Sequence, residues 1–139
     1  NNRENLSFKE AFLNESKRTQ DDFKKIYTNH LYYADSYFTY SYFERGIYVD
    51  KIKRWMEVFP KEQFLIIQSE EFFKNPSKIY NDVLEFLGLD PFSVEEFKIK
   101  GKVNKNRNID DDFRNELVEY FKPHNKRLYD FLGKSFDWN

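Results

Sequence analysis

A run of basic residues between positions 98 and 107 is the part of the sequence best suited to bind an anion. The segment from Lys98 to Arg107 carries five basic residues, one glycine and no acidic residue. Lysine and arginine side chains, together with exposed backbone N–H groups, can hold a phosphate or sulfate group. A solvated basic linker between two helices explains the same composition, because runs of one charge commonly form exposed surfaces. Both interpretations stay open at this point.

The histidines and a pair of glutamates are the other candidates for chemistry. His30 and His124 lack the spacing with acidic residues that a zinc-binding helix needs, so we expect no metal site. His30 lies in an aromatic segment and is a candidate base, although a lone histidine is more often structural. Glu70 and Glu71 follow an apolar run, where open parallel sheets bind ligands, but acids at a helix start explain them better. These patterns assign no catalytic residue.

Composition limits the kind of protein. The chain has 139 residues, of which 40% are hydrophobic and 20% aromatic, which predicts a single globular domain over residues 1–139. A net charge of -1 gives no overall attraction to nucleic acid or to an anionic membrane, so we expect no nucleic-acid partner. The absence of cysteine excludes disulfides and thiolate chemistry. No apolar run approaches the roughly 20 residues of a membrane span, and the first residue, Asn1, suggests a longer parent chain.

Capping signals and periodic apolar residues predict helices along most of the chain. Ser7 and Glu10 form a capping box at the start of a short helix, which we expect to end in the polar stretch 14–22 before a second helix. The further expected elements are a helix over 48–59 stopped by Pro60, a helix from Pro76 to Gly88, a turn within 90–97, a helix starting at Asp110 to Asp112, and a last helix beginning at Pro123.

One strand is expected near 63–68. Phe64 to Ile67 form a continuous apolar run, which is typical of a parallel strand buried on both faces. Such a strand needs neighbours for its backbone groups, and the chain offers few. Either residues outside this chain complete the sheet, or the strand lies at an edge in an oligomer or complex. The predicted fold class is therefore α/β, mostly helical.

The order of several motifs resembles the sulfotransferase family that uses phosphoadenosine phosphosulfate (PAPS) as its sulfonate donor. An RGxY segment at Arg45–Tyr48 opens a helix that ends near Trp55. The segments that follow in the family's order are FPKEQ at 59–63, the apolar run 64–68, SEEF at 69–72, Asn75-Pro76, FLGL at 86–89 and a closing stretch from 121 to 138. The resemblance covers about Arg45 to Trp138, and the ordered set is more specific than any one motif.

The resemblance implies a P-loop-like parallel-sheet fold of which this chain is the C-terminal portion. In that family the loop before the closing helix covers the donor, and its basic residues reach the donor's phosphates. The donor contacts implied are Lys102, Asn104, Lys105 and Arg107. The family's usual tyrosine–proline pair is replaced here by Asn106-Arg107. The expected donor is PAPS, with phosphoadenosine phosphate (PAP) as the product.

The resemblance also implies an acceptor with a hydroxyl or amine, on a carbohydrate, a small alcohol or a carrier-bound chain. The aromatic segment 29–43 is expected to line its pocket, and the implied substrate contacts are His30, Tyr42, Arg45 and Tyr48. The family's phosphosulfate loop and catalytic base lie upstream of the matched region. We therefore expect this chain to be inactive alone. The alternative is a non-catalytic helical module, descended from such an enzyme, that binds a protein partner through its aromatic surface.

Overall fold

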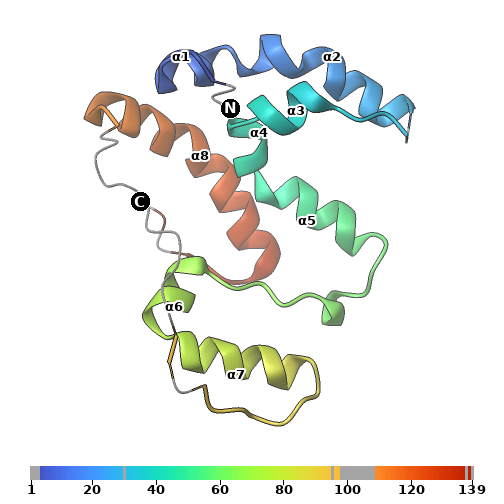
Figure 1. The fold of residues 1–139 in the computed structure, drawn as a ribbon, viewed down its shortest axis with the longest axis vertical. Coiled ribbons are helices and arrows are strands. Elements are labelled where there is room, and N and C mark those ends of the chain that lie inside the picture. Colours follow the sequence, from blue (N-terminus) through green and yellow to red (C-terminus); the bar gives the residue numbers. More distant parts are fainter. Residues whose placement is uncertain (1–3, 30, 95, 98–108, 137, 139) are drawn as a thin grey trace. The chain divides into compact units, whose positions relative to one another are not determined.

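A computed structural model of the protein describes residues 4–29, 31–94, 96–97, 109–136 and 138, and its regular elements are all helices (Figure 1). The chain divides into two compact units. Unit 1 comprises Asn1–Ile52, Ile109–Ser135 and Asn139, and unit 2 comprises Lys53–Asn108 and Phe136–Trp138.

Unit 1 begins with the predicted capping box. The helices of unit 1 are α1 (Phe8–Leu13), α2 (Glu15–Thr28), α3 (Asp35–Tyr40), α4 (Phe43–Gly46), the start of α5 (Tyr48–Met56) and α8 (Asp111–Leu132). The Ser7 hydroxyl accepts from the backbone N–H of Glu10 at 3.4 Å, and the Glu10 carboxylate accepts from the backbone N–H of Ser7 at 3.0 Å. This reciprocal pair satisfies two N–H groups that the helix itself leaves unpaired, so the predicted start of α1 is confirmed.

Helix α1 ends at Leu13 with Asn14 as its C-cap, so its predicted end in the polar stretch 14–22 is confirmed, and the expected second helix takes in the rest of that stretch. This second helix, α2, begins directly at Glu15 and runs to Thr28. Its buried side is polar, because Glu15, Thr19 and Asp22 are each less than 9% exposed. These positions follow the helical period, so they lie on one face. The polar residues of this stretch therefore belong to a helix whose buried side is itself polar.

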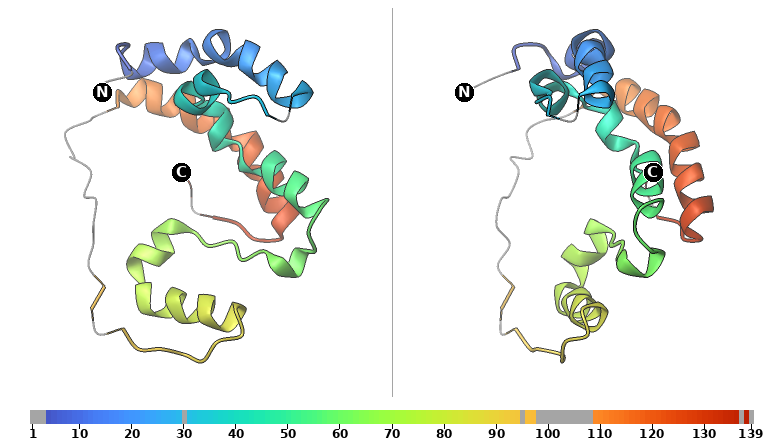
Figure 2. Two further views of the ribbon diagram at one scale, coloured as in Figure 1. Left: turned by 45° about the vertical axis from the view of Figure 1, so that its right-hand side comes forward. Right: turned by 90° about the vertical axis from the view of Figure 1, so that its right-hand side faces the viewer.

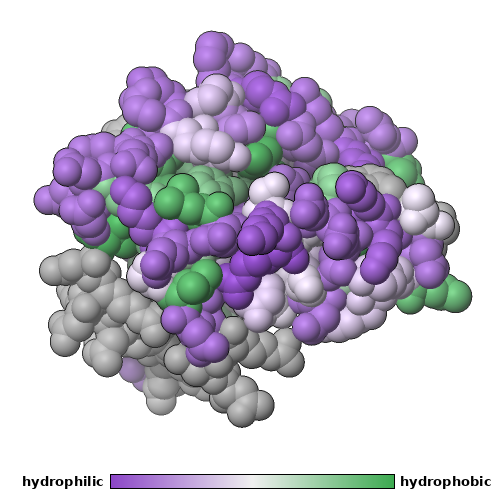
Figure 3. All heavy atoms as spheres, turned by 90° about the horizontal axis from the view of Figure 1, so that it is seen from above, coloured by the Kyte–Doolittle hydropathy of each residue, from purple (hydrophilic) through white to green (hydrophobic). Residues whose placement is uncertain are grey.

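The other side of α2 faces solvent. The view of the structure from above, over α1 and α2, shows mostly hydrophilic side chains, with hydrophobic ones gathered in smaller patches between them (Figure 3). The exposed polar residues of α2 include Lys17, Gln20, Asp21, Lys24 and Lys25.

Helix α8 is continuous through Pro123, so the prediction that a separate helix begins there was wrong. The Asp110 carboxylate caps the helix by accepting from the backbone N–H of Phe113 at 3.3 Å, and Gly133, with φ of 67°, ends it. Proline inside a helix removes one backbone hydrogen bond. The helix persists because its inner face is anchored on both sides of the proline, by buried Phe113 before it and buried Leu128 after it.

Aromatic rings form the centre of unit 1. Phe12 packs against Phe43 and lies edge-on to Phe113 at 5.6 Å between ring centroids. Phe43 also contacts Tyr120 of α8 at 4.5 Å. Both views of Figure 2 show α8 alongside the start of α5, where Arg127 pairs with Asp50. The core therefore joins α1, α4 and α8, which are far apart in sequence.

Unit 2 contains the end of α5, a 3₁₀ turn η1 (Lys61–Gln63), α6 (Ser69–Lys74) and α7 (Pro76–Phe86), and α6 packs against α7. The helix predicted from Pro76 is confirmed, with Gly88 at a φ of 69° just beyond its end. The expected turn within 90–97 is not found, because the described residues 90–94 and 96–97 contain no helical turn.

The predicted strand, and with it the α/β fold class, is contradicted. Residues 64–68 are extended at both ends, with φ and ψ of -115° and 123° at Phe64, but they form no strand. An extended segment becomes a strand only when its backbone groups pair with a neighbour, and no strand exists among the described residues. The run is also not buried on both faces, because Leu65 and Ile67 are 40% and 37% exposed. The described residues therefore form a helical structure.

Candidate functional site

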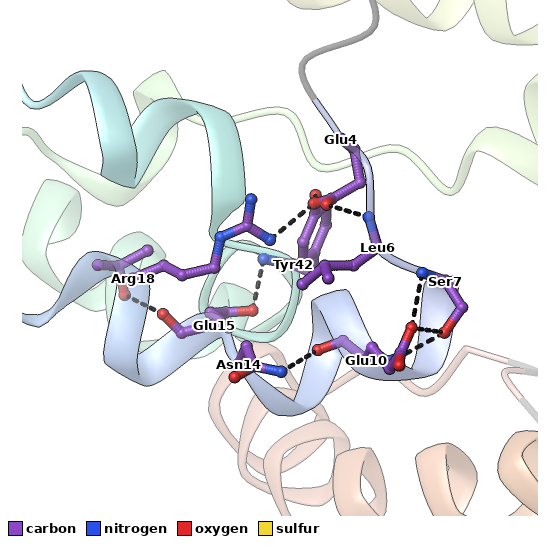
Figure 4. A network of polar contacts seen from close by, with 9 residues as sticks. Glu4, Leu6, Ser7, Glu10, Asn14, Glu15, Arg18 and Tyr42 are labelled. Atoms are coloured by element: carbon purple, nitrogen blue, oxygen red, sulfur yellow. Dashed lines mark hydrogen bonds and ion pairs between the residues drawn. The ribbon is translucent and has the colours of Figure 1, made fainter.

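Glu15 of α2 holds the start of α4. Its carboxylate accepts hydrogen bonds from the backbone N–H groups of Tyr42 and Phe43, both at 2.5 Å, and of Glu44 at 3.0 Å. These are N–H groups that a helix start leaves without internal partners, and α4 has no side-chain cap of its own. A buried carboxylate from another helix thus supplies the missing cap (Figure 4).

Asp22, further along the same face of α2, does the same for α3. It accepts from the backbone N–H groups of Ser36 at 2.8 Å and Tyr37 at 3.2 Å, and from the Tyr32 hydroxyl at 2.5 Å. The hydrogen bond from Tyr32, assisted by the two backbone bonds, lowers the pKa of Asp22 below its ordinary value. Asp22 therefore stays ionised and keeps α3 against α2.

Tyr42 belongs to a second polar cluster, shown in Figure 4. Its hydroxyl donates to the Glu4 carboxylate at 2.6 Å, and Arg18 donates to the same oxygen at 2.8 Å. The hydrogen bonds from Tyr42, the Leu6 backbone and Arg18 lower the pKa of Glu4 to about 2. Burial, followed by the bond to Glu4, raises the pKa of Tyr42 to about 12. Tyr42 thus lies where the N-terminal segment, α2 and α4 meet.

The far end of α4 is also held. The Lys51 ammonium donates to the backbone carbonyl of Glu44, and burial lowers the pKa of Lys51. Gly46 lies against the ring of Phe121, so close that an added Cβ would be 2.7 Å from the ring atom Cε1. Because a side chain does not fit there, α8 can approach α4 only at a glycine.

Two of the predicted substrate residues are exposed beside this anchored segment. Arg45 is exposed, and its Nη1 donates to the Phe38 carbonyl at 3.3 Å. Tyr48, at the start of α5, is 49% exposed. Tyr42, Arg45 and Tyr48 lie in one short stretch of the sequence, and the Tyr42 hydroxyl binds Glu4 whereas Arg45 and Tyr48 are exposed. His30 lies outside the described residues.

A hollow of about 490 Å³ lies on unit 1. Aromatic rings and polar side chains line it together, from α1, α2, α3, α4 and α8. Its lining includes Phe12, Glu15, Thr19, Phe23, Tyr37, Phe43, Glu44 and Tyr120. Among the described residues, the predicted substrate contacts Tyr42, Arg45 and Tyr48 do not line this hollow.

The remaining candidates are accounted for individually. The predicted donor contacts Lys102, Asn104, Lys105 and Arg107 lie outside the described residues. Glu70 lies in the first turn of α6, where it accepts from the Ser69 hydroxyl at 3.2 Å, as expected for an acid at a helix start. The described part of the chain contains no cluster of potential metal ligands and no helix long and apolar enough to cross a membrane.

Sequence reasoning missed Glu15 and Asp22, although a signal was present. Two acids at positions i and i+7 share one helix face, and Thr19 continues that face. Reading helical periodicity in polar residues as well as apolar ones would have marked these positions.

The sequence pattern of the sulfotransferase domain matches residues 8–124, so the match begins well before Arg45, where the ordered motifs begin. Among curated proteins, the chain is similar to the membrane-associated sulfotransferase kil1 of Dictyostelium discoideum. The two are 27% identical over 100 residues, which cover 72% of this chain and 21% of that protein.

Two further relatives are named for carbohydrate substrates. Human heparan sulfate glucosamine 3-O-sulfotransferase 3B1 is 24% identical over 124 residues, covering 73% of this chain and 32% of that protein. Mouse carbohydrate sulfotransferase 15 is 31% identical over 104 residues, covering 67% of this chain and 18% of that protein. The chain thus spans a third or less of the length of these relatives.

A solved structure gives the same result in three dimensions. The crystal structure of a sulfotransferase from Alicyclobacillus acidocaldarius superposes with a TM-score of 0.71 at 28% sequence identity. The superposition covers 96% of this chain and 46% of that one. The sequence match over residues 8–124 and this structural likeness show that the chain belongs to the sulfotransferase family.

Proposed function

We propose that the protein to which this chain belongs transfers a sulfonate group from PAPS to a hydroxyl or amine of an acceptor. The observation that carries the proposal is the sulfotransferase match over residues 8–124. The reaction breaks the bond between the donor's sulfur and its bridging phosphate oxygen and forms a bond from sulfur to the acceptor atom. PAP leaves, and a base takes the acceptor's proton.

We propose Lys102, Asn104, Lys105 and Arg107 as donor contacts, on the sequence resemblance alone. Cationic side chains beside phosphate groups form charge-assisted hydrogen bonds and stabilise the charge that develops on the leaving group. The base is not among the residues assigned in this chain.

Arg45 and Tyr48, with Tyr42 beside them, are the proposed acceptor contacts. The exposure of Arg45 and Tyr48 supports this role, and so does the anchoring of the segment that carries them. Two relatives are named for carbohydrate substrates, which favours a carbohydrate acceptor. A guanidinium group suits such an acceptor if the sugar carries carboxylate or sulfate groups, because it can bind them through two parallel hydrogen bonds.

We further propose that residues 1–139 form the C-terminal part of one larger sulfotransferase domain. The solved relative is supporting evidence, since the superposition covers 46% of that chain. Unit 2 adds a second indication, because several of its large apolar side chains are exposed. They include Leu65, Phe72, Phe73, Leu87, Leu89 and Phe92, with exposed fractions between 39% and 66%.

The test uses the full-length protein, PAPS labelled with ³⁵S, and two acceptors: desulfated heparan oligosaccharides and a small phenol. Transfer of label to the oligosaccharide, with PAP released, is the expected result. Calorimetry with PAP measures donor binding separately. If the full-length protein neither transfers label nor binds PAP, the enzyme proposal is wrong and the non-catalytic interaction module takes its place.

A further inference from the structure

Helix α4 is too short to hold its own shape. It comprises only Phe43–Gly46, and a helix of this length forms too few internal hydrogen bonds to offset the entropy of ordering its backbone. Its conformation must therefore come from contacts with the rest of unit 1.

Glu15 supplies the largest set of polar contacts at the start of α4. Both of its carboxylate oxygens are used, one by Tyr42 and Phe43 and the other by Glu44. The residue is 6% exposed, so these bonds are shielded from competing water. The three N–H groups converge on one buried carboxylate, and these bonds fix the position and direction of the backbone that leads into Arg45.

Two further contacts, one on each side of Arg45, complete the anchoring. Lys51 binds the Glu44 carbonyl, and the ring of Phe121 lies against Gly46. Arg45 is exposed, its Nη1 donates to the Phe38 carbonyl at 3.3 Å, and its backbone is held immediately before and immediately after it. A guanidinium group that binds a carboxylate through two parallel hydrogen bonds must be held in one orientation, and the fixed backbone around Arg45 supplies this.

We propose that Glu15 is a positioning residue for acceptor binding: it acts through the backbone of residues 42–44 and sets the direction of Arg45. The inference rests on the proposed role of Arg45 in acceptor binding. Glu15 itself does not touch the acceptor in this scheme, because its carboxylate oxygens are occupied by backbone donors.

The first experiment measures the anchoring without any activity. Glu15→Gln keeps the shape of the side chain but removes its charge and turns one acceptor oxygen into a donor. Hydrogen exchange on the full-length protein should accelerate about tenfold or more at the amides of Tyr42, Phe43 and Glu44. The amides of Ser36 and Tyr37 should keep their rates, and Asp22→Asn should show the reverse pattern. Unchanged exchange at residues 42–44 overturns the proposal.

The second experiment measures the consequence for the acceptor. With heparan oligosaccharide as acceptor, Glu15→Gln should raise the acceptor KM about tenfold, with the KM for PAPS unchanged and kcat altered less than about twofold. Glu15→Asp retains the charge and should recover part of the affinity. Asp110→Ala removes the cap of α8 and controls for lost stability, so it should leave the acceptor KM unchanged.

Two outcomes separate the positioning role from the proposed function. If Glu15→Gln and Asp110→Ala raise the acceptor KM equally, Glu15 has only a structural role and the inference is wrong. If Arg45→Ala leaves the acceptor KM unchanged, the assignment of Arg45 to the acceptor fails. In that case the exchange experiment still decides whether Glu15 anchors α4.

Discussion

Glu15 and Asp22 lie on one face of α2, and each accepts backbone N–H groups from the start of a different helix. Glu15 receives three such bonds from the residues that begin α4, and Asp22 receives two from the beginning of α3. Helix starts carry partial positive charge, so a carboxylate is the matching partner. One helix therefore organises the two short helices that follow it through main-chain contacts.

Replacing Glu15 with alanine should destabilise the protein strongly. The substitution leaves three N–H groups without their charged acceptor in a shielded place, and we expect a loss of about 2–4 kcal/mol in the free energy of unfolding. Urea unfolding of the full-length protein measures it. Glu119→Ala is the matched control, because Glu119 forms an exposed ion pair with Lys122 and should change stability by less than about 0.5 kcal/mol. Equal losses in the two variants would contradict the capping role.

Adding a methyl group at Gly46 should push α4 away from α8. The new Cβ would lie 2.7 Å from the Phe121 ring, so Gly46→Ala should cost about 1–3 kcal/mol of stability. Phe121→Leu removes the ring atoms involved. The double variant should therefore lose less stability than the sum of the two single variants, which a double-mutant cycle measures. Strict additivity would show that the two residues do not interfere.

Acid should weaken the cluster around Glu4. The pKa of Glu4 falls from its ordinary value of 4.5 to about 2 in the folded protein. A carboxyl group with a lowered pKa stabilises the fold above its unfolded value, and this contribution disappears as the pH falls toward the folded value. Between about pH 5 and pH 2 the urea midpoint should therefore fall more steeply in the native protein than in Glu4→Gln. Asp22 and Glu10 titrate in both proteins, so their effects cancel in the comparison. Identical slopes would be evidence against the cluster.

The donor assignment has a direct binding test. Replacing Lys102 and Lys105 together with alanine should weaken PAP binding by about a hundredfold, because two charge-assisted contacts to phosphate are lost. Isothermal titration calorimetry of the full-length protein measures the change. Lys17→Ala removes an exposed lysine of α2 and should bind PAP like the native protein. If the double variant binds PAP with the affinity of the native protein, the assignment of Lys102 and Lys105 as donor contacts is wrong.

The sequence predicted correctly those helices that begin at a recognisable capping residue or proline. The capping box at Ser7 and the proline at Pro76 determine backbone geometry within a few residues, so α1 and α7 were found. The continuity of α8 through Pro123 depends instead on packing between distant segments, which no local pattern contains. The apolar run 64–68 had the composition of a buried strand, but a strand also requires a partner that a composition cannot supply.

In the candidate site too, local sequence patterns identified some residues and long-range contacts determined others. The exposed positions of Arg45 and Tyr48 lie in a segment that motif order had already singled out. The residue that anchors this segment, Glu15, lies nearly thirty positions earlier and was hidden in a polar stretch. Its role depends on tertiary contact with backbone atoms, which leave no mark on the sequence of α4 itself.

The Glu15 carboxylate accepts hydrogen bonds from the backbone N–H groups of residues 42–44, so these bonds do not require particular side chains at those positions. On the proposed acceptor role of Arg45, a substitution at position 45 should change acceptor preference and leave the three bonds to Glu15 in place. Phe43 and Gly46 are the exceptions, since the ring of Phe43 packs against Phe12 and Tyr120 and the missing side chain of Gly46 is part of the fit to Phe121. Within α4, position 45 can therefore vary while positions 43 and 46 are constrained by packing.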